Sequence, residues 1–181
     1  TYIGTGNFNE ATAGIYTDLG LLTSNKEISL EVSRVFGMLE NNLERHAFRH
    51  LLVSPFNTRR KLMALIEREI KFAKAKKPAH IRLKFNNLTD IKMIDKLYAA
   101  SKAGVKIELI IRGICCLKPG VKGLSDNITA ISIVDRYLEH ARFFIFSNNG
   151  NPEYFISSAD WMERNLDPVS YTHLTLPTNR E

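Results

Sequence analysis

The sequence predicts an α/β protein with a mixed sheet. Strand-like runs alternate along the chain with runs whose apolar residues recur at helical spacing, an order typical of α/β domains. Hydrophobic residues make up 44% and charged residues 24% of the 181-residue chain, which predicts an ordinary globular core. The length fits one or two domains, and no apolar run is long enough to span a membrane.

The first part of the chain predicts a strand, a helix and a linker. Residues 16–23 read as a strand, and Ser24 with Glu27 forms a capping box at the start of a helix. The apolar residues of this helix repeat at helical spacing and are Ile28, Val32, Val35, Phe36 and Leu39. Residues 40–46 are polar, so we place a linker and a domain boundary there.

A second unit follows the linker. Residues 50–54 read as a strand, and Ser54 and Pro55 supply the N-cap and the first residue of a helix that runs to about Lys77. Residues 80–86 alternate as the next strand. A second helix covers residues 89–103 and stops at Gly104. Its apolar face consists of Ile91, Ile94, Leu97 and Tyr98.

The rest of the second unit predicts three or four strands. Residues 105–113 read as a strand, and the glycines and proline within 115–127 indicate a long loop. A further strand or buried segment covers 128–134. Residues 142–147 and 153–158 then read as two antiparallel strands joined by a turn.

Charge is concentrated in the middle of the chain. Between Arg59 and Lys122 there are 17 Lys and Arg against 5 Asp and Glu, a net +12, whereas the whole chain carries only +6. Such a region favours an anionic partner, and solvated helix faces are the alternative.

The chain has two cysteines, Cys115 and Cys116, which are neighbours in sequence. Neighbouring cysteines rarely form a disulfide with each other, and two cysteines alone do not make up the four ligands of a structural zinc site. A reducing cytoplasm is therefore the simplest setting.

Two short turns have residues suited to an anion. GTGNFNE, from Gly4 to Glu10, contains glycines that let backbone N–H groups approach an oxyanion, and Asn7 can orient an imidazole or a phosphate. A purely structural turn is the alternative. The stretch ISSADW ends a strand in the same way and contains Asp160, so the two turns are candidates for distant copies of one element.

A histidine and an arginine stand two residues apart in the stretch DRYLEHARFFIF. A helix-like run there gives way to a strand, and His140 and Arg142 would share one face of that strand. The pair suits acid–base chemistry on a phosphate, and a buried structural histidine is the alternative. Arg112 ends another strand, a good place for phosphate capture or for pairing with an acid.

Seven stretches, in order along the chain, resemble the C-terminal half of bacterial polyphosphate kinase. They read YIGTGNFNEATAGIYTDLGLLT, VSPFNTRR, LKFNNLTD, LYAASKAGVKIELIIRGICCLKPG, LSDNI, SIVDRYLEHARFFIF and SSADWMERNLD. The resemblance covers residues 1 to about 168 and implies a phospholipase D-like fold. On this basis we expect mixed-sheet domains, with the end of a first catalytic domain at residues 1–46 and most of a second at residues 47–168.

The resemblance implies an ATP-polyphosphate phosphotransferase. In that family the terminal phosphate of ATP passes reversibly to polyphosphate through a phosphohistidine, with magnesium. His140 matches a second catalytic histidine that acts as general acid or base, and Asp18 matches a carboxylate that orients a histidine. The residues expected to contact ATP or phosphate are Tyr16, Arg112, His140, Lys84 and Asn86, to which Asn7 is added from its turn.

Some parts of the family pattern are missing from this sequence. The nucleophilic histidine and the Mg²⁺ ligands belong to segments that precede GTGN, and Tyr2 stands where a histidine is usual. No metal ligands are predicted within the chain, which we expect to be a fragment that is inactive alone. Residues 169–181, with His173, leave the pattern and read as a non-native tail.

The resemblance also implies partners and a location. We expect ATP or ADP and inorganic polyphosphate as substrates, self-association of the intact protein, and no nucleic acid partner. The cytoplasm is the expected location, with peripheral attachment to the inner face of a bacterial membrane as an option. Two alternative functions stay open: a phospholipase D-like phosphodiesterase or nuclease, for which H-x-R replaces the usual second H-x-K, and a non-catalytic polyanion-binding module.

Overall fold

The computed structural model of the chain describes residues 1–41 and 46–167. The expected non-native tail and His173 lie outside these residues, as do residues 42–45 of the expected linker. None of the helices within the described residues is long and apolar enough to cross a bilayer.

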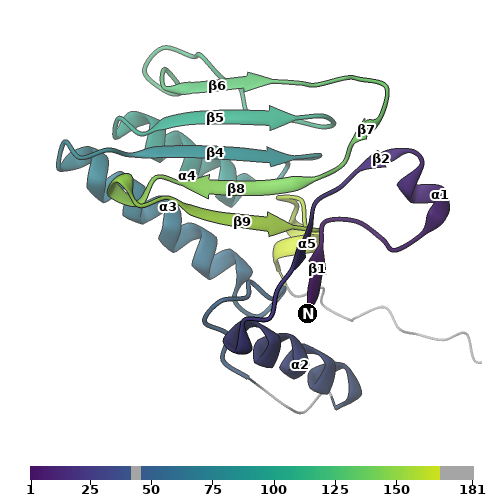
Figure 1. The fold of residues 1–181 in the computed structure, drawn as a ribbon. Coiled ribbons are helices and arrows are strands. Elements are labelled where there is room, and N and C mark those ends of the chain that lie inside the picture. The colour runs from purple at the N-terminus through teal and green to yellow at the C-terminus, as the bar shows by residue number, and fades with distance from the viewer. Residues whose placement is uncertain (42–45, 168–181) are drawn as a thin grey trace, which may run out of the picture.

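A five-stranded mixed sheet forms the centre of the structure (Figure 1). Its strands lie in the order β6-β5-β4-β8-β9 and span Ile128–Ile131, Lys106–Ile111, His80–Phe85, Arg142–Phe146 and Glu153–Ser157. The first three strands are parallel to one another, whereas β8 is antiparallel to both β4 and β9. The prediction of a mixed α/β sheet is therefore confirmed.

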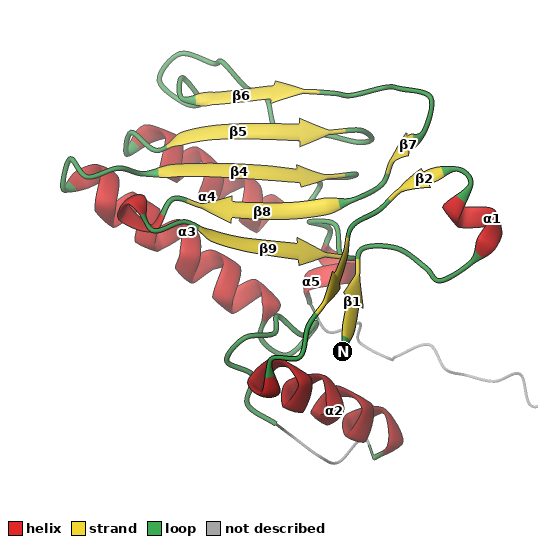
Figure 2. Cartoon of the chain, viewed as in Figure 1, coloured by secondary structure: helices red, strands yellow, loops and turns green. Residues whose placement is uncertain are grey.

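Two long helices cover one face of this sheet (Figure 2). They are α3 (Thr58–Lys74) and α4 (Ile91–Lys102). Every second residue of β4 and β5 faces them, which explains why Ile81, Leu83 and Phe85 are buried while Arg82 is exposed. Trp161 is fully buried and stacks on Phe85 with ring centroids 5.3 Å apart, just before the short helix α5 (Glu163–Leu166).

The first forty residues lie beside one edge of the sheet (Figure 1). They form β1 (Tyr2–Gly4), α1 (Glu10–Ala13), β2 (Tyr16–Thr17), β3 (Gly20–Leu22) and α2 (Lys26–Glu40). β1 pairs with β3, whereas β2 pairs in parallel with β7 (Leu138–Glu139), far along the chain. This second pairing joins the first segment to the strand that precedes His140.

Three predictions of secondary structure are wrong in detail. Residues 16–23 form two short strands in two different sheets. The run before His140 is not helical, since it forms β7. Residues 50–54 form no strand because their backbone donors bind side chains instead of a neighbouring strand: His50 and Leu51 donate to Glu31, and Val53 donates to Asn57.

The helix starts and faces also differ from the predictions. Asn25, not Ser24, caps α2, because its Oδ1 accepts from two backbone N–H groups at once. α3 begins at Thr58 rather than Pro55, after a turn that the side chain of Asn57 holds. The residues expected on apolar faces but found exposed are Phe36, Leu39 and Ile91. By contrast, Gly104 follows α4 with a positive φ of 94°, as the sequence indicated.

One buried carboxylate fastens α2 to the segment that leads into α3. Glu31 is 4% exposed and accepts hydrogen bonds from the backbone N–H groups of Arg49, His50 and Leu51. Burial alone would raise the pKa of Glu31, but these three donors outweigh it and hold the pKa below its usual value of 4.5. Charged Glu31 therefore stabilises the junction between the two parts of the chain.

Replacing Glu31 with Gln should destabilise the chain by roughly 1–3 kcal/mol at neutral pH, because the charged acceptor is lost. Since the folded pKa of Glu31 is lowered, its contribution is complete above the unfolded pKa and disappears as the pH falls through the folded pKa. Urea unfolding between pH 3 and pH 7 should show the gap between wild type and Glu31→Gln closing below about pH 4.5. Glu40→Gln, at an exposed site on the same helix, is the control and should show little effect at any pH.

Candidate functional site

The predicted site residues gather at one edge of the sheet. This site edge lies where β4 and β5 end, where β8 begins, and where the β2–β7 pair attaches (Figure 1). His140 stands between β7 and β8, and its ring is one-fifth exposed. Arg142 is buried and is the first residue of β8. The site edge thus holds His140 and Arg142 side by side.

The imidazole of His140 is held from both of its nitrogens. Its Nδ1 lies 2.9 Å and 3.1 Å from the two carboxylate oxygens of Asp18, which follows β2. Its Nε2 lies 3.1 Å from Nη1 of Arg142. A guanidinium only donates, so Nε2 accepts and Nδ1 carries the hydrogen that is donated to Asp18. The contacts therefore select one tautomer of the neutral ring.

The GTGN turn positions Asp18. The hydroxyl of Thr5 donates to Asp18 Oδ1 at 2.6 Å and accepts from the backbone N–H of Leu19. A Cβ on Gly6 would overlap the carboxylate of Asp18, so only glycine leaves room for the carboxylate at this position. The turn therefore acts through Asp18, by a contact that the sequence did not reveal.

Tyr16 contacts His140, and Asn7 lies in the same pocket as Tyr16. The rings of Tyr16 and His140 have centroids 4.8 Å apart and are tilted by 36°. Tyr16, Asp18 and Asn7 line a pocket of about 560 Å³ beside β2. Asn7 is exposed, and no hydrogen bond joins its side chain to His140 within the described residues. Three predicted site residues thus share one pocket.

Asp160 is the centre of a second network at the site edge. It is buried, and its Oδ1 accepts from Nε of Arg142 at 3.0 Å and from the backbone N–H of Asn86 at 2.9 Å. Its Oδ2 accepts from the side-chain amide of Asn87 at 3.1 Å. Burial alone would raise the pKa of Asp160, but the bond from Arg142 and the other donors outweigh it and lower the pKa. Asp160 is therefore ionised and holds Arg142, Asn86 and Asn87 by hydrogen bonds.

The remaining predicted residues flank these two networks. Lys84 is buried, and its Nζ donates to the carbonyl of Ala141 at 2.8 Å and pairs with Glu139 at 3.2 Å. It thereby fixes the residues on either side of His140. Asn86 is also buried, and its Oδ1 accepts from Nε of Arg112 at 3.2 Å. Arg112 is half-buried and has no carboxylate partner within residues 1–41 and 46–167.

Sequence reasoning missed the roles of three members of the site. Thr5 and Asn87 gave no signal beyond their place in a turn or at a strand end. Asp160 was singled out only as part of a repeated turn, and its partner Arg142 could not be inferred from spacing. Thr5 acts on Asp18 across the first turns of the chain, and Asp160 acts on Arg142 where β8 meets the loop after β9. A single sequence does not encode either contact locally.

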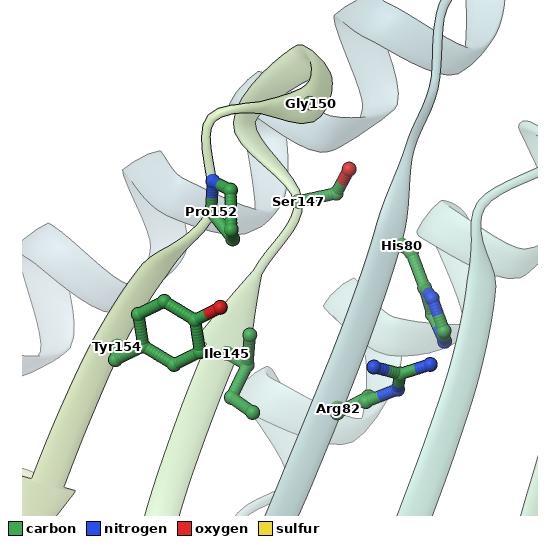
Figure 3. A pocket seen from close by; sticks show the side chains of 7 residues that line it. All are labelled: His80, Arg82, Ile145, Ser147, Gly150, Pro152 and Tyr154. Carbon is green, nitrogen blue, oxygen red and sulfur yellow. The ribbon is translucent and has the colours of Figure 1, made fainter.

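A different pocket opens at the other end of β4 (Figure 3). His80 and Arg82 line it together with Tyr154 and residues of the β8–β9 turn. It shares no residue with the site edge, because β8 runs antiparallel to β4 and its far end lies there. Arg82 is already paired with Glu108 at 2.7 Å. This pocket is therefore separate from the predicted site.

Five of the seventeen Lys and Arg residues of the basic middle region are engaged in the ion pairs that follow. The pairs are Arg59–Asp90, Arg59–Asp167, Arg68–Glu153, Arg82–Glu108, Lys96–Glu67 and Lys106–Glu108. The exposed lysines near the end of α3 are Lys71, Lys74, Lys76 and Lys77. Because these lysines cluster at one exposed helix end, they fit the alternative of a solvated helix better than they fit a single anion-binding face.

The described residues offer no metal site. No group of three His, Cys, Asp or Glu side chains in this part of the chain is placed to hold a metal ion. Asp18 and Asp160 are separately engaged with His140 and Arg142. These side chains therefore do not fit a Mg²⁺ ion, and the ligands expected from the family stay a prediction for another segment.

Comparison with known proteins decides the family. The model of polyphosphate kinase C-terminal domain 1 matches residues 1–45, and that of C-terminal domain 2 matches residues 51–170. The chain belongs to the polyphosphate kinase family. Polyphosphate kinase from Vibrio cholerae is 59% identical over 166 residues, and that from Escherichia coli K12 is 54% identical over 166 residues. Each match covers 92% of this chain and 24% of the relative.

The fold agrees with a solved member of the polyphosphate kinase family. The crystal structure from Porphyromonas gingivalis matches with a TM-score of 0.88 and 49% identity, over 92% of this chain and 26% of that chain. The predicted phospholipase D-like fold is thereby confirmed. The chain spans about a quarter of the length of these relatives.

Gly6→Ala should displace the Asp18 carboxylate from His140 while leaving the fold intact, because the obstructed group is a side chain that can move. The ring ¹⁵N shifts of His140 should then show a loss of the Nδ1–H tautomer. Gly14→Ala is the matched control, since the nearest atom to its Cβ is 3.7 Å away. Unchanged ¹⁵N shifts in a folded Gly6→Ala chain would contradict the role given to the GTGN turn.

Proposed function

We propose that the intact protein is a polyphosphate kinase that reversibly transfers the terminal phosphate of ATP to inorganic polyphosphate. The observation that carries this proposal is the Asp18–His140–Arg142 arrangement within a chain that matches both C-terminal domains of that family. The relatives named polyphosphate kinase support the substrates. Polyphosphate and ATP or ADP are therefore the proposed partners.

His140 would serve as the general acid or base. Asp18 fixes the ring with the hydrogen on Nδ1, so that Nε2 is the atom that takes up or releases a proton. The carboxylate also stabilises the imidazolium that forms when Nε2 is protonated. Because Nη1 of Arg142 contacts Nε2, an incoming phosphoryl oxygen has to replace this contact before Nε2 can take up or release a proton.

Arg112, Tyr16 and Asn7 would contact the phosphates. A transferring phosphoryl group spreads negative charge over its oxygens, so catalysis depends mainly on positioning and on charge stabilisation. Arg112 is held through Nε by Asn86, which leaves its terminal nitrogens to bind an anion. Lys84 acts indirectly, through its bonds beside His140.

The remaining expectations concern the intact protein. A histidine in a preceding segment would attack the terminal phosphorus of ATP, the bond to the bridging oxygen would break, and ADP would leave. The phosphoryl group would then pass from that histidine to polyphosphate. We also propose magnesium dependence, self-association, and a cytoplasmic location with peripheral membrane attachment. The family resemblance supports each of these.

In the intact protein, His140→Ala should lower kcat about 10²- to 10⁴-fold, the usual contribution of general acid–base catalysis. Steady-state ADP-forming assays with polyphosphate measure the loss, and thermal unfolding measures stability. His50→Ala is the control, because His50 pairs with Glu27 at an exposed site away from His140. It should leave kcat unchanged.

Two results would contradict the proposal. A loss of thermal stability in His140→Ala that parallels its loss of activity would give His140 a structural role only. Hydrolysis of a phosphodiester by the intact protein, without transfer from ATP to polyphosphate, would favour the phosphodiesterase alternative.

A further inference from the structure

Arg142 contacts His140 through one end and is anchored at the other. Its Nη1 lies 3.1 Å from His140 Nε2 and donates to the His140 carbonyl at the same distance. Its Nε donates to Asp160 at 3.0 Å. The guanidinium is rigid and planar, so fixing Nε fixes the direction of Nη1. The position of Asp160 therefore determines where Arg142 meets the imidazole.

The backbone around Asp160 is itself held in place. The N–H of Trp161 donates to the carbonyl of Asn87 at 3.2 Å, and the carbonyl of Trp161 accepts from Thr89 and Asp90. The Trp161 side chain is fully buried in the core. Asp160 thus stands on a rigid support, which is what a group that positions another side chain requires.

We propose that Asp160 is a positioning residue that acts on His140 through Arg142, a role that rests on the proposed acid–base function of His140. Asp18 would orient the ring from Nδ1, and the Asp160–Arg142 pair would orient it from Nε2. Asp160 also accepts from Asn86 and Asn87, so a purely structural role is the alternative to be separated.

The first test measures the His140 ring directly in the 181-residue chain. Asp160→Asn should shift the ¹⁵N resonance of Nε2 in the same direction as Arg142→Gln does, because both changes remove the donor from Nε2. Asp90→Asn is the matched control. Asp90 is likewise buried, accepts from an arginine and from a backbone N–H, yet lies in a separate ion pair with Arg59. This variant should lose stability without moving the Nε2 resonance.

The second test is a double-mutant cycle on kcat in the intact protein. Asp160→Asn and Arg142→Gln should each lower kcat roughly 10- to 100-fold, the equivalent of one charge-assisted hydrogen bond. If Asp160 acts through Arg142, the double variant should be no worse than Arg142→Gln alone. Additive losses, or an unmoved Nε2 resonance in Asp160→Asn, would overturn the proposal.

Two further measurements keep the outcome decisive. If Asp160→Asn does not fold, the test is instead the rate of solvent exchange of the Arg142 Nε–H in the wild-type chain. This exchange should be slower than that of exposed Arg60, and equal rates would overturn the proposal. If the wild-type intact protein shows no kinase activity, the proposed function fails, whereas the resonance shifts still decide whether Asp160 positions His140.

Discussion

The contact between Asp18 and His140 is the constraint on which the site depends. The two residues are 122 positions apart in sequence, yet Nδ1 and a carboxylate oxygen lie 2.9 Å apart. The β2–β7 pairing brings their backbones together, with Tyr16 opposite Leu138 and Thr17 opposite Glu139. Without this short parallel ladder, His140 would lack the acceptor that selects its tautomer.

The second unit was largely predictable because its elements carry strong local patterns. The alternation in β4 and the helical spacing in α4 reflect burial against one layer, so each predicts its own structure. The first forty residues were less predictable. β2 and β3 are two and three residues long, and their pairing is decided by distant partners rather than by propensity. The strand predicted at residues 50–54 is absent for a related reason: a carboxylate and a side-chain amide accept the hydrogen bonds of its backbone N–H groups.

The site was predictable to the extent that its chemistry is local. The spacing of His140 and Arg142 placed both on one side, and the contact at Nε2 agrees with that expectation. Asp18 came from the family resemblance rather than from spacing. The roles of Thr5 and Asp160 could not be found, because Thr5 contacts Asp18 across a turn and Asp160 contacts Arg142 at the start of β8, and neither contact has a local sequence signal.

The two turns complete the site in different ways. In the GTGN turn, Gly6 has no side chain, which leaves room for the carboxylate of Asp18. The ISSADW turn instead supplies a carboxylate, that of Asp160, which accepts from Arg142. Rotation of the His140 ring would break its bond to Asp18 at Nδ1 or its bond to Arg142 at Nε2. Under the proposed function, these contacts would orient the His140 ring before substrate binds, which is where positioned acid–base groups gain most of their advantage over the same groups in water.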